Sequence, residues 1–216
     1  LRRRSKLVAG GHMTAPAKDS VYSGVLTLHL LRICMFLAKL NSLDVHAADI
    51  GNAYLEAFTK ELVYNIAGPE FGDRQGNVLI IVKALYGLRT SGAHFHKKFS
   101  DTLKDMGFTS SSADPDVWMK PCGTHYKYVC VYVDDLAVMM KSPEDFFLGL
   151  KKRKYKLKGA IGITYHLKSV GEITYHLGGD FYRDPNGTLA WGARTYVKHI
   201  INQSEAIFGN PPKEYM

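Results

Sequence analysis

Residues 132–135 (YVDD) lie between two apolar, β-prone runs, residues 126–131 (YKYVCV) and 136–140 (LAVMM). Two such runs around a short polar turn predict a β-hairpin. The turn would bring two adjacent carboxylates together, which is unfavourable because like charges raise each other's pKa. A divalent cation removes this conflict, since Mg²⁺ prefers hard oxygen ligands. For the tetrapeptide alone, an ordinary Asp-Asp turn facing solvent is an equally good explanation.

A third acidic residue favours the metal site. Residues 43–48 (LDVHAA) alternate in polarity and predict a strand, and Asp49 follows directly, before a glycine turn into a helical start. An acid at the end of a strand is then directed at the hairpin. Three carboxylates from two strands would form a site for two metal ions, as in phosphoryl transfer.

The charge balance favours a polyanionic partner. In 216 residues there are 28 basic and 20 acidic side chains, which gives a net charge of +8 and a pI near 9.3. Much of the excess lies in residues 2–6 and 151–158. Phosphate contacts are one explanation for such clusters, and a solvated helix face is the other.

Cysteine and hydropathy patterns exclude several classes of protein. Cys34, Cys122 and Cys130 are scattered and contain no C-x-x-C, so neither a disulfide framework nor a zinc ribbon is expected, and an intracellular location fits. His94 and His96 would point to different sides of a helix, so they are not expected to bind one metal ion together.

Residues 25–40 are too short and too charged to span a membrane. They predict a buried helix, with apolar residues at helical spacing at Leu26, Leu30, Ile33, Leu37 and Leu40. No signal peptide is visible at the start of the sequence, which opens on LRRR without an initiator Met, and we expect the chain to be a piece of a longer polyprotein.

The remaining pattern indicates strands and helices in mixed order, typical of an α+β fold. Strands are expected at residues 62–66, 78–82 and 117–119, and around a turn at residues 184–187. Helices are expected from Gly92 to Met106, with Gly107 as the stop, from Ser142 onward, and from Thr195 onward.

Several segments, in this order, resemble one enzyme family. D-x-x-x-A-Y at residues 49–54 and the YVDD about eighty residues later are similar to motifs A and C of reverse transcriptases. Residues 83–92 (KALYGLRTSG), 6–12 (KLVAGGH) and 175–181 (YHLGGDF) resemble the motif B segment, a fingers segment and the primer-grip strand of the copia-type (Ty1/copia, Pseudoviridae) retrotransposon enzymes. The likeness runs from Arg2 to about Phe208.

The resemblance implies a right-hand polymerase fold: an α+β palm with a mixed or antiparallel sheet, packed helices and interleaved fingers, and a partial or absent thumb. It places a fingers segment and the first palm helix in residues 1–48. The palm would occupy residues 49–194, and the start of the thumb or connection residues 195–216.

The resemblance also implies roles for individual residues. Asp49, Asp134 and Asp135 would be catalytic and, with the carbonyl of Ile50, would bind two Mg²⁺ (or Mn²⁺) ions. Tyr54 would be the steric gate that excludes a 2′-hydroxyl. The other nucleotide-binding candidates are Tyr86, Gly87, Arg89, Lys6 and Arg4. The nucleic-acid-binding candidates are Lys151, Lys152, Arg153, Lys154, Gly178 and Gly179.

The implied reaction is transfer of a nucleotide from a dNTP to the 3′-hydroxyl of a primer on an RNA or DNA template. The implied partners are primer–template, dNTPs, and the integrase and RNase H portions of the same polyprotein, with no membrane. The implied location is a cytoplasmic virus-like particle or the nucleus.

One segment departs from the family pattern. Residues 163–167 (ITYHL) recur as residues 173–177, whereas relatives carry this sequence once. The repeat is too short for a solenoid, so we expect a local loop or strand extension that the fold tolerates. Deleting residues 163–172 is then expected to change the melting temperature little.

Two other functions compete with polymerisation. The chain could be an inactive retroelement fragment that only binds nucleic acid. Residues 178–181 (GGDF) suggest a nucleotide cyclase, but they come late, lack a following acid and match the primer-grip strand better.

Overall fold

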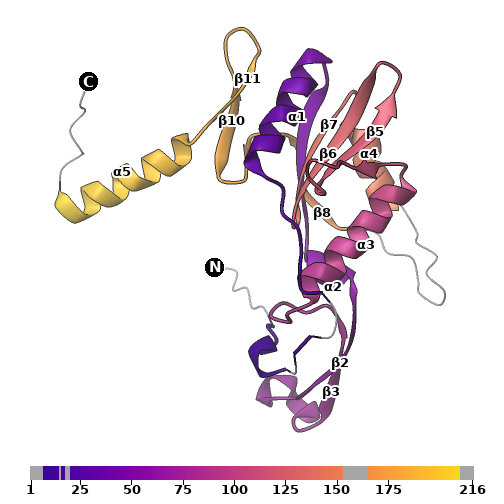
Figure 1. Cartoon of the computed structure of the whole chain (residues 1–216). Helices are drawn as coiled ribbons and strands as arrows, with labels where there is room; N and C mark the ends of the chain where they lie inside the picture. Colours follow the sequence, from indigo (N-terminus) through magenta and orange to yellow (C-terminus); the bar gives the residue numbers. More distant parts are fainter. Residues whose placement is uncertain (1–6, 15, 18–19, 153–164, 210–216) are drawn as a thin grey trace.

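A six-stranded antiparallel sheet forms the centre of the computed structural model, which describes residues 7–14, 16–17, 20–152 and 165–209 (Figure 1). Its strand order is β4-β5-β6-β7-β1-β8. The strands are β1 (Asp44–Ile50), β4 (Thr109–Ser110), β5 (Val117–Cys122), β6 (His125–Tyr132), β7 (Asp135–Met140) and β8 (Leu167–Glu172). The strand that carries Asp49 is therefore inserted between β7 and β8, which follow it by many residues in the chain.

Both faces of this sheet are covered, which is why β6 and β7 are almost continuously apolar. Helices α3 (Ser91–Asp105) and α4 (Pro143–Lys152) bury Phe95, Phe99 and Phe147 in the core on one face, together with Val129 and Val131 of β6. The other face is covered by helix α1 (Leu28–Leu40), in a second core that contains Cys130. Alternate residues of one strand thus face different cores.

Two smaller sheets extend from this centre. Strands β2 (Phe58–Ile66) and β3 (Val78–Lys83) form a projecting hairpin, joined through the 3₁₀ helix η2 (Pro69–Arg74) and preceded by the short helix α2 (Ala53–Glu56). The 3₁₀ helix η1 (Gly11–Met13) lies near this hairpin (Figure 1). Strands β9 (Tyr175–His176), β10 (Gly179–Arg183) and β11 (Leu189–Gly192) form the third sheet, beside α1.

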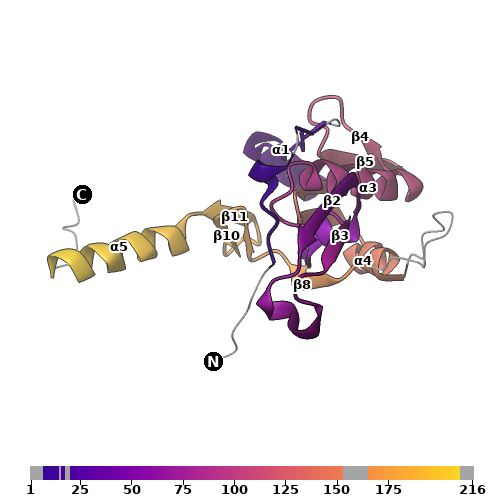
Figure 2. The same ribbon diagram turned by 90° about the horizontal axis from the view of Figure 1, so that it is seen from below.

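The last helix, α5 (Arg194–Phe208), projects away from the rest of the protein (Figure 1 and Figure 2). Its start is attached to β10. The carboxylate of Asp180 accepts hydrogen bonds from the backbone N and the hydroxyl of Thr195, at 2.7 and 2.5 Å, and thereby caps the helix. The guanidinium of Arg194 lies 3.7 Å from the ring centre of Tyr182. None of the residues of α5 is buried.

Most local predictions from sequence are confirmed. The YVDD hairpin is β6–β7, the helix expected from Gly92 is α3, and Gly107 adopts a left-handed φ of 81° at its end. The strands expected at residues 62–66, 78–82 and 117–119 lie within β2, β3 and β5. The predicted α+β class is confirmed, with antiparallel sheets. Among the described residues no helix is long and apolar enough to cross a membrane.

The predicted buried face of α1 was wrong in part. Leu31, Cys34 and Ala38 are the buried residues of this helix, whereas Ile33 and Leu40 are 50% and 63% exposed. Apolar residues occur around much of the helix, so their spacing alone did not determine which stripe faces the sheet.

The structure gives a reason to revise the prediction that deleting one repeat copy changes the melting temperature little. Tyr165 of the first copy is only 1% exposed, in the core beneath α3, whereas Tyr175 of the second copy is 56% exposed. Strand β8 lies between the two copies and pairs with β1. Deleting residues 163–172 would therefore remove a core side chain and the whole edge strand β8.

Candidate active site

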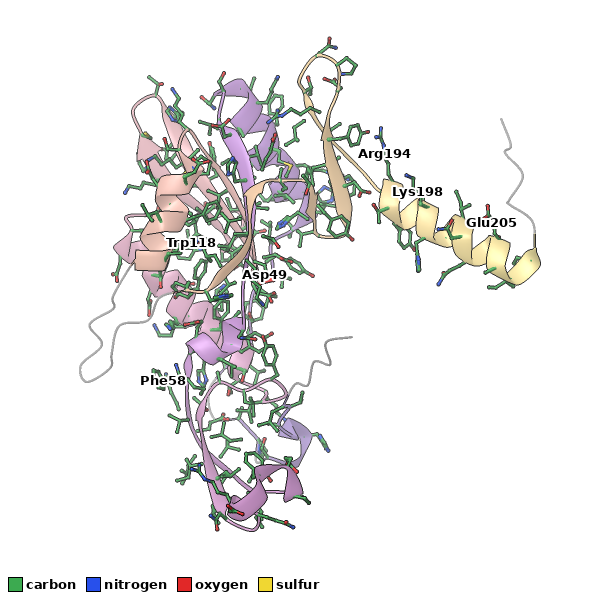
Figure 3. All side chains as sticks on the ribbon, turned by 180° about the vertical axis from the view of Figure 1, so that it is seen from behind. Asp49, Phe58, Trp118, Arg194, Lys198 and Glu205 are labelled. Carbon is green, nitrogen blue, oxygen red and sulfur yellow. The ribbon has the colours of Figure 1, made fainter. Side chains whose placement is uncertain are left out.

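The three aspartates expected to act together are close in space. In the β1–β7 ladder Asp49 lies directly opposite Asp135, and Asp134 occupies the adjoining β6–β7 turn. The backbone N of Ile50 donates a 2.8 Å hydrogen bond to the carbonyl of Asp134 and fixes the turn against β1. Figure 3 shows Asp49 at the end of β1 nearest the β2–β3 hairpin, which carries Phe58. Pairing of distant strands thus brings the carboxylates together.

The turn itself differs from a simple Asp-Asp turn. Its two residues are Val133 and Asp134, because Tyr132 pairs with Asp135, which already begins β7. Val133 has a left-handed φ of 55°. A β-branched residue in this region is uncommon, and the conformation costs about 1–2 kcal/mol. Such strain persists where the surrounding structure enforces it.

The electrostatics of the three aspartates favour a cation. Burial, together with the neighbouring carboxylates of Asp134 and Asp49, raises the pKa of Asp135. Oxygen donors crowded in this way suit a hard divalent ion such as Mg²⁺, which would stabilise their ionised forms. The donor set therefore fits the implied metal, although no group of three or more His, Cys, Asp or Glu in the described part of the chain is arranged as a finished metal site.

Two tyrosines lie beside the aspartates. The turn after β1 takes a left-handed conformation at Asn52, with φ 56°, and leads into α2, which carries Tyr54. The ring centres of Tyr54 and Tyr86 are 4.8 Å apart, and both side chains are half-buried. Burial, and then the charge of Asp134, raises the pKa of each hydroxyl, so both stay neutral hydrogen-bonding groups. An aromatic wall therefore borders the carboxylates.

The KALYGL segment contacts the N-terminal part of the chain. A Cβ at Gly11 would collide with the carbonyl oxygen of Gly87, and a Cβ at Gly87, which has a φ of 92°, would collide with the carbonyl oxygen of Ala9. Arg89 donates from Nε to the carbonyl of Gly11 at 3.0 Å and from Nη2 to that of His12 at 3.4 Å. Its guanidinium thus fixes this segment, and a contact with triphosphate stays a prediction. Arg4 and Lys6 lie outside the described residues.

A cleft of about 540 Å³ opens on the α1 side of the sheet. It is lined by Leu26, Leu28, Tyr132, Asp135, Tyr175, His176, Leu177 and Gly178. Burial lowers the pKa of His176 to about 4, so its imidazole is neutral at pH 7. Gly178 faces the cleft, whereas Gly179 is buried against the indole of Trp191, which leaves no room for a Cβ.

The basic candidates of the second cluster lie largely outside the structure described. Lys151 is exposed near the end of α4. Lys152 ends that helix, but its side chain is not described, and Arg153 and Lys154 lie outside the described residues. Their nucleic-acid contacts stay predictions.

Sequence reasoning missed two basic residues beside the aspartates. Lys168 of β8 pairs in register with Asp49, on the side opposite Asp135. Lys168 and His166 both lie over Gly51, where an added Cβ would be 2.7 Å from His166 Nδ1. In the sequence they were marked only by their place in the repeated segment. The resemblance to the family gave no role to that segment.

Comparison with known proteins identifies the family. The family model described as "Reverse transcriptase (RNA-dependent DNA polymerase)" matches residues 1–213. The chain belongs to this reverse transcriptase family. It is homologous to the Pol polyproteins of Ty1/copia-type retrotransposons, as expected from the motifs.

Curated relatives come from plants and yeast. The chain is 27% identical, over 97% of its length, to the "Retrovirus-related Pol polyprotein from transposon RE1" of Arabidopsis thaliana. It is 24% identical, over 86% of its length, to the corresponding polyprotein from transposon TNT 1-94 of Nicotiana tabacum. It is 28% identical, over 64% of its length, to the "Transposon Ty1-BL Gag-Pol polyprotein" of Saccharomyces cerevisiae. It spans 14%, 14% and 8% of these relatives. No solved structure gave a match.

Proposed function

We propose that this reverse transcriptase domain catalyses RNA-directed DNA polymerisation. In this reaction the 3′-hydroxyl of a primer attacks the α-phosphate of a dNTP, a new phosphodiester forms, and pyrophosphate leaves. An RNA or DNA template selects the base by pairing, so the protein is expected to contact mainly the sugar-phosphate backbone of the nucleic acid. The observation that carries the proposal is the pairing of Asp49 with Asp135 beside Asp134 in the turn.

The aspartates would hold the metal. Asp49, Asp134, Asp135 and the carbonyl of Ile50 are the proposed ligands of two Mg²⁺ or Mn²⁺ ions. When bound, such ions neutralise negative charge on the attacking and leaving oxygens. The protein's own contribution is to keep three carboxylates on two paired strands and a strained turn, so that little reorganisation is needed as charge develops.

The tyrosines would select and orient the nucleotide. Tyr54 is the proposed steric gate beneath the deoxyribose, supported by its place on α2 beside the aspartates and by its contact with Tyr86. Tyr86, Gly87 and Arg89 are proposed to line the nucleotide and template side, and Arg4 and Lys6 to reach the triphosphate.

The primer would lie along the cleft. Asp135 and Gly178 both line it, which supports a primer terminus between the aspartates and the third sheet. Gly179 would act by close packing that positions Gly178. In the proposed division, residues 1–48 form a fingers segment and the first palm helix, residues 49–194 the palm with interleaved fingers, and residues 195–216 the start of a thumb or connection. Integrase and RNase H portions of a polyprotein are the proposed partners.

Primer extension on poly(rA)/oligo(dT) with Mg²⁺ or Mn²⁺ tests this function. Asp134→Asn and Asp49→Asn should each lower nucleotide addition by at least about a hundredfold, since each removes charge stabilisation needed mainly in the transition state. Asp44→Asn, at the exposed far end of the same strand, is the matched control and should extend normally.

Two outcomes would contradict the proposal. Wild-type rates from either aspartate variant would exclude the metal site. A wild-type protein that shifts primer–template in a binding assay but never extends it would favour the inactive, binding-only fragment.

A further inference from the structure

Two acidic residues before β5 are buried, although the proposed chemistry does not use them. Asp114 and Asp116 are 5% and 1% exposed. Asp114 accepts hydrogen bonds from the backbone N and hydroxyl of Thr27, the N-cap of α1, at 3.0 and 3.1 Å. It also accepts one from the backbone N of Asp116 at 3.0 Å. This pair of acids therefore connects the start of α1 to the start of β5.

Asp116 also binds α3. His96 Nε2 lies 2.6 Å from Asp116 Oδ1 and donates to it, because a carboxylate can only accept. The chain before α1 packs on the other carboxylate oxygen so tightly that a side chain at Gly24 would collide with it. An apolar contact could hold the helix on the sheet equally well, whereas this directional hydrogen bond from the half-buried His96 to the buried carboxylate of Asp116 favours one defined arrangement.

This arrangement reaches the catalytic turn. The backbone N of Val131 donates to the carbonyl of Asp116 at 2.9 Å, two residues before the strained Val133. His96, Asp116, Val133 and Ser23 all line one small cavity of about 10 Å³ directly behind the turn. A shift of His96 or Asp116 would therefore be transmitted to Val133 and to the adjacent Asp134.

We infer that His96 and Asp116 form a positioning pair that holds the Val133–Asp134 turn in its strained, active conformation. The hydrogen bond between His96 and Asp116 fixes α3 to the start of β5, and β5 is paired with β6. Because β6 leads into the turn, Asp134 then keeps its backbone hydrogen bond with Ile50. Its effect on catalysis rests on the proposed polymerase function. Its effect on the turn does not.

The pair should act on turnover more than on binding. Loss of the hydrogen bond in His96→Leu should lower kcat by at least about tenfold and leave the dNTP KM within about twofold, because a misplacement of about 1 Å can cost roughly a hundredfold in rate. His96→Gln, whose amide can still donate to Asp116, should restore most of the rate. His29→Leu, an exposed histidine on α1, is the matched control.

Hydrogen–deuterium exchange supplies a readout independent of activity. In His96→Leu, peptides covering residues 131–136 should exchange faster, while those of β2–β3 should not change. Unchanged exchange at the turn, or equal kcat in the Leu and Gln variants, would overturn the positioning role. If wild-type protein fails to extend primers yet its turn loosens in His96→Leu, the polymerase proposal fails and the positioning pair stands.

Discussion

Tyr165 provides a sharp test of which repeat copy belongs to the core. Its ring meets that of Phe99 edge-on, with centres 5.4 Å apart, and its hydroxyl lies 2.7 Å from Thr102 Oγ1. Tyr175, the same residue of the second copy, is exposed. Substituting one tyrosine at a time therefore compares identical chemistry in two environments.

The expected magnitudes differ widely. Truncating a buried aromatic residue to alanine costs about 3–5 kcal/mol, so Tyr165→Ala should lower the free energy of unfolding by that amount. For a chain of this size each kcal/mol shifts Tm by about 2–4 °C, which gives roughly 6–20 °C. Tyr165→Phe removes only the hydroxyl contact and should cost about 0.5–1.5 kcal/mol. Tyr175→Ala should stay within about 0.5 kcal/mol of wild type.

Thermal unfolding and urea titration followed by circular dichroism would measure these differences. Equal losses at Tyr165 and Tyr175 would refute the reasoning, and a larger loss at Tyr175 would show that the second copy occupies the core. Deleting residues 163–172 should destabilise the protein at least as much as Tyr165→Ala, since β8 is lost as well.

Three further outcomes are expected. Tyr54→Val should raise the kcat/KM for rNTPs relative to dNTPs in primer extension, because a steric gate acts by volume, and an unchanged ratio would make Tyr54 a packing residue only. Primer–template affinity should fall steeply with salt, and neutralising three lysines within residues 151–158 should flatten the log–log slope by about two to three units. If that slope persists, the cluster is a solvated face. Burial lowers the pKa of Lys98 to about 8, below its value in the unfolded chain, so the unfolded state binds this proton more tightly. The free energy of unfolding should then rise by at most roughly 3 kcal/mol between pH 8 and 10.5, and a Lys98→Met variant that keeps the full rise would refute this assignment.

The sequence alone determined the features whose signal is local. The apolar runs around YVDD predicted β6–β7, and the helix pattern from Gly92 to Met106 with its stop at Gly107 predicted α3, because strand and helix signals are properties of a few neighbouring residues. The order of the motifs also indicated the family and Asp49, Asp134 and Asp135 as the candidate site.

Only the tertiary structure decided what depends on pairing between distant segments. It placed β1 between β7 and β8, and so set Asp49 opposite both Asp135 and Lys168. It buried Tyr165 and exposed Tyr175, although the two copies have the same sequence around them. The physical reason is that register and burial follow from how whole sheets and helices cover one another, so identical local sequences can take different places in one fold.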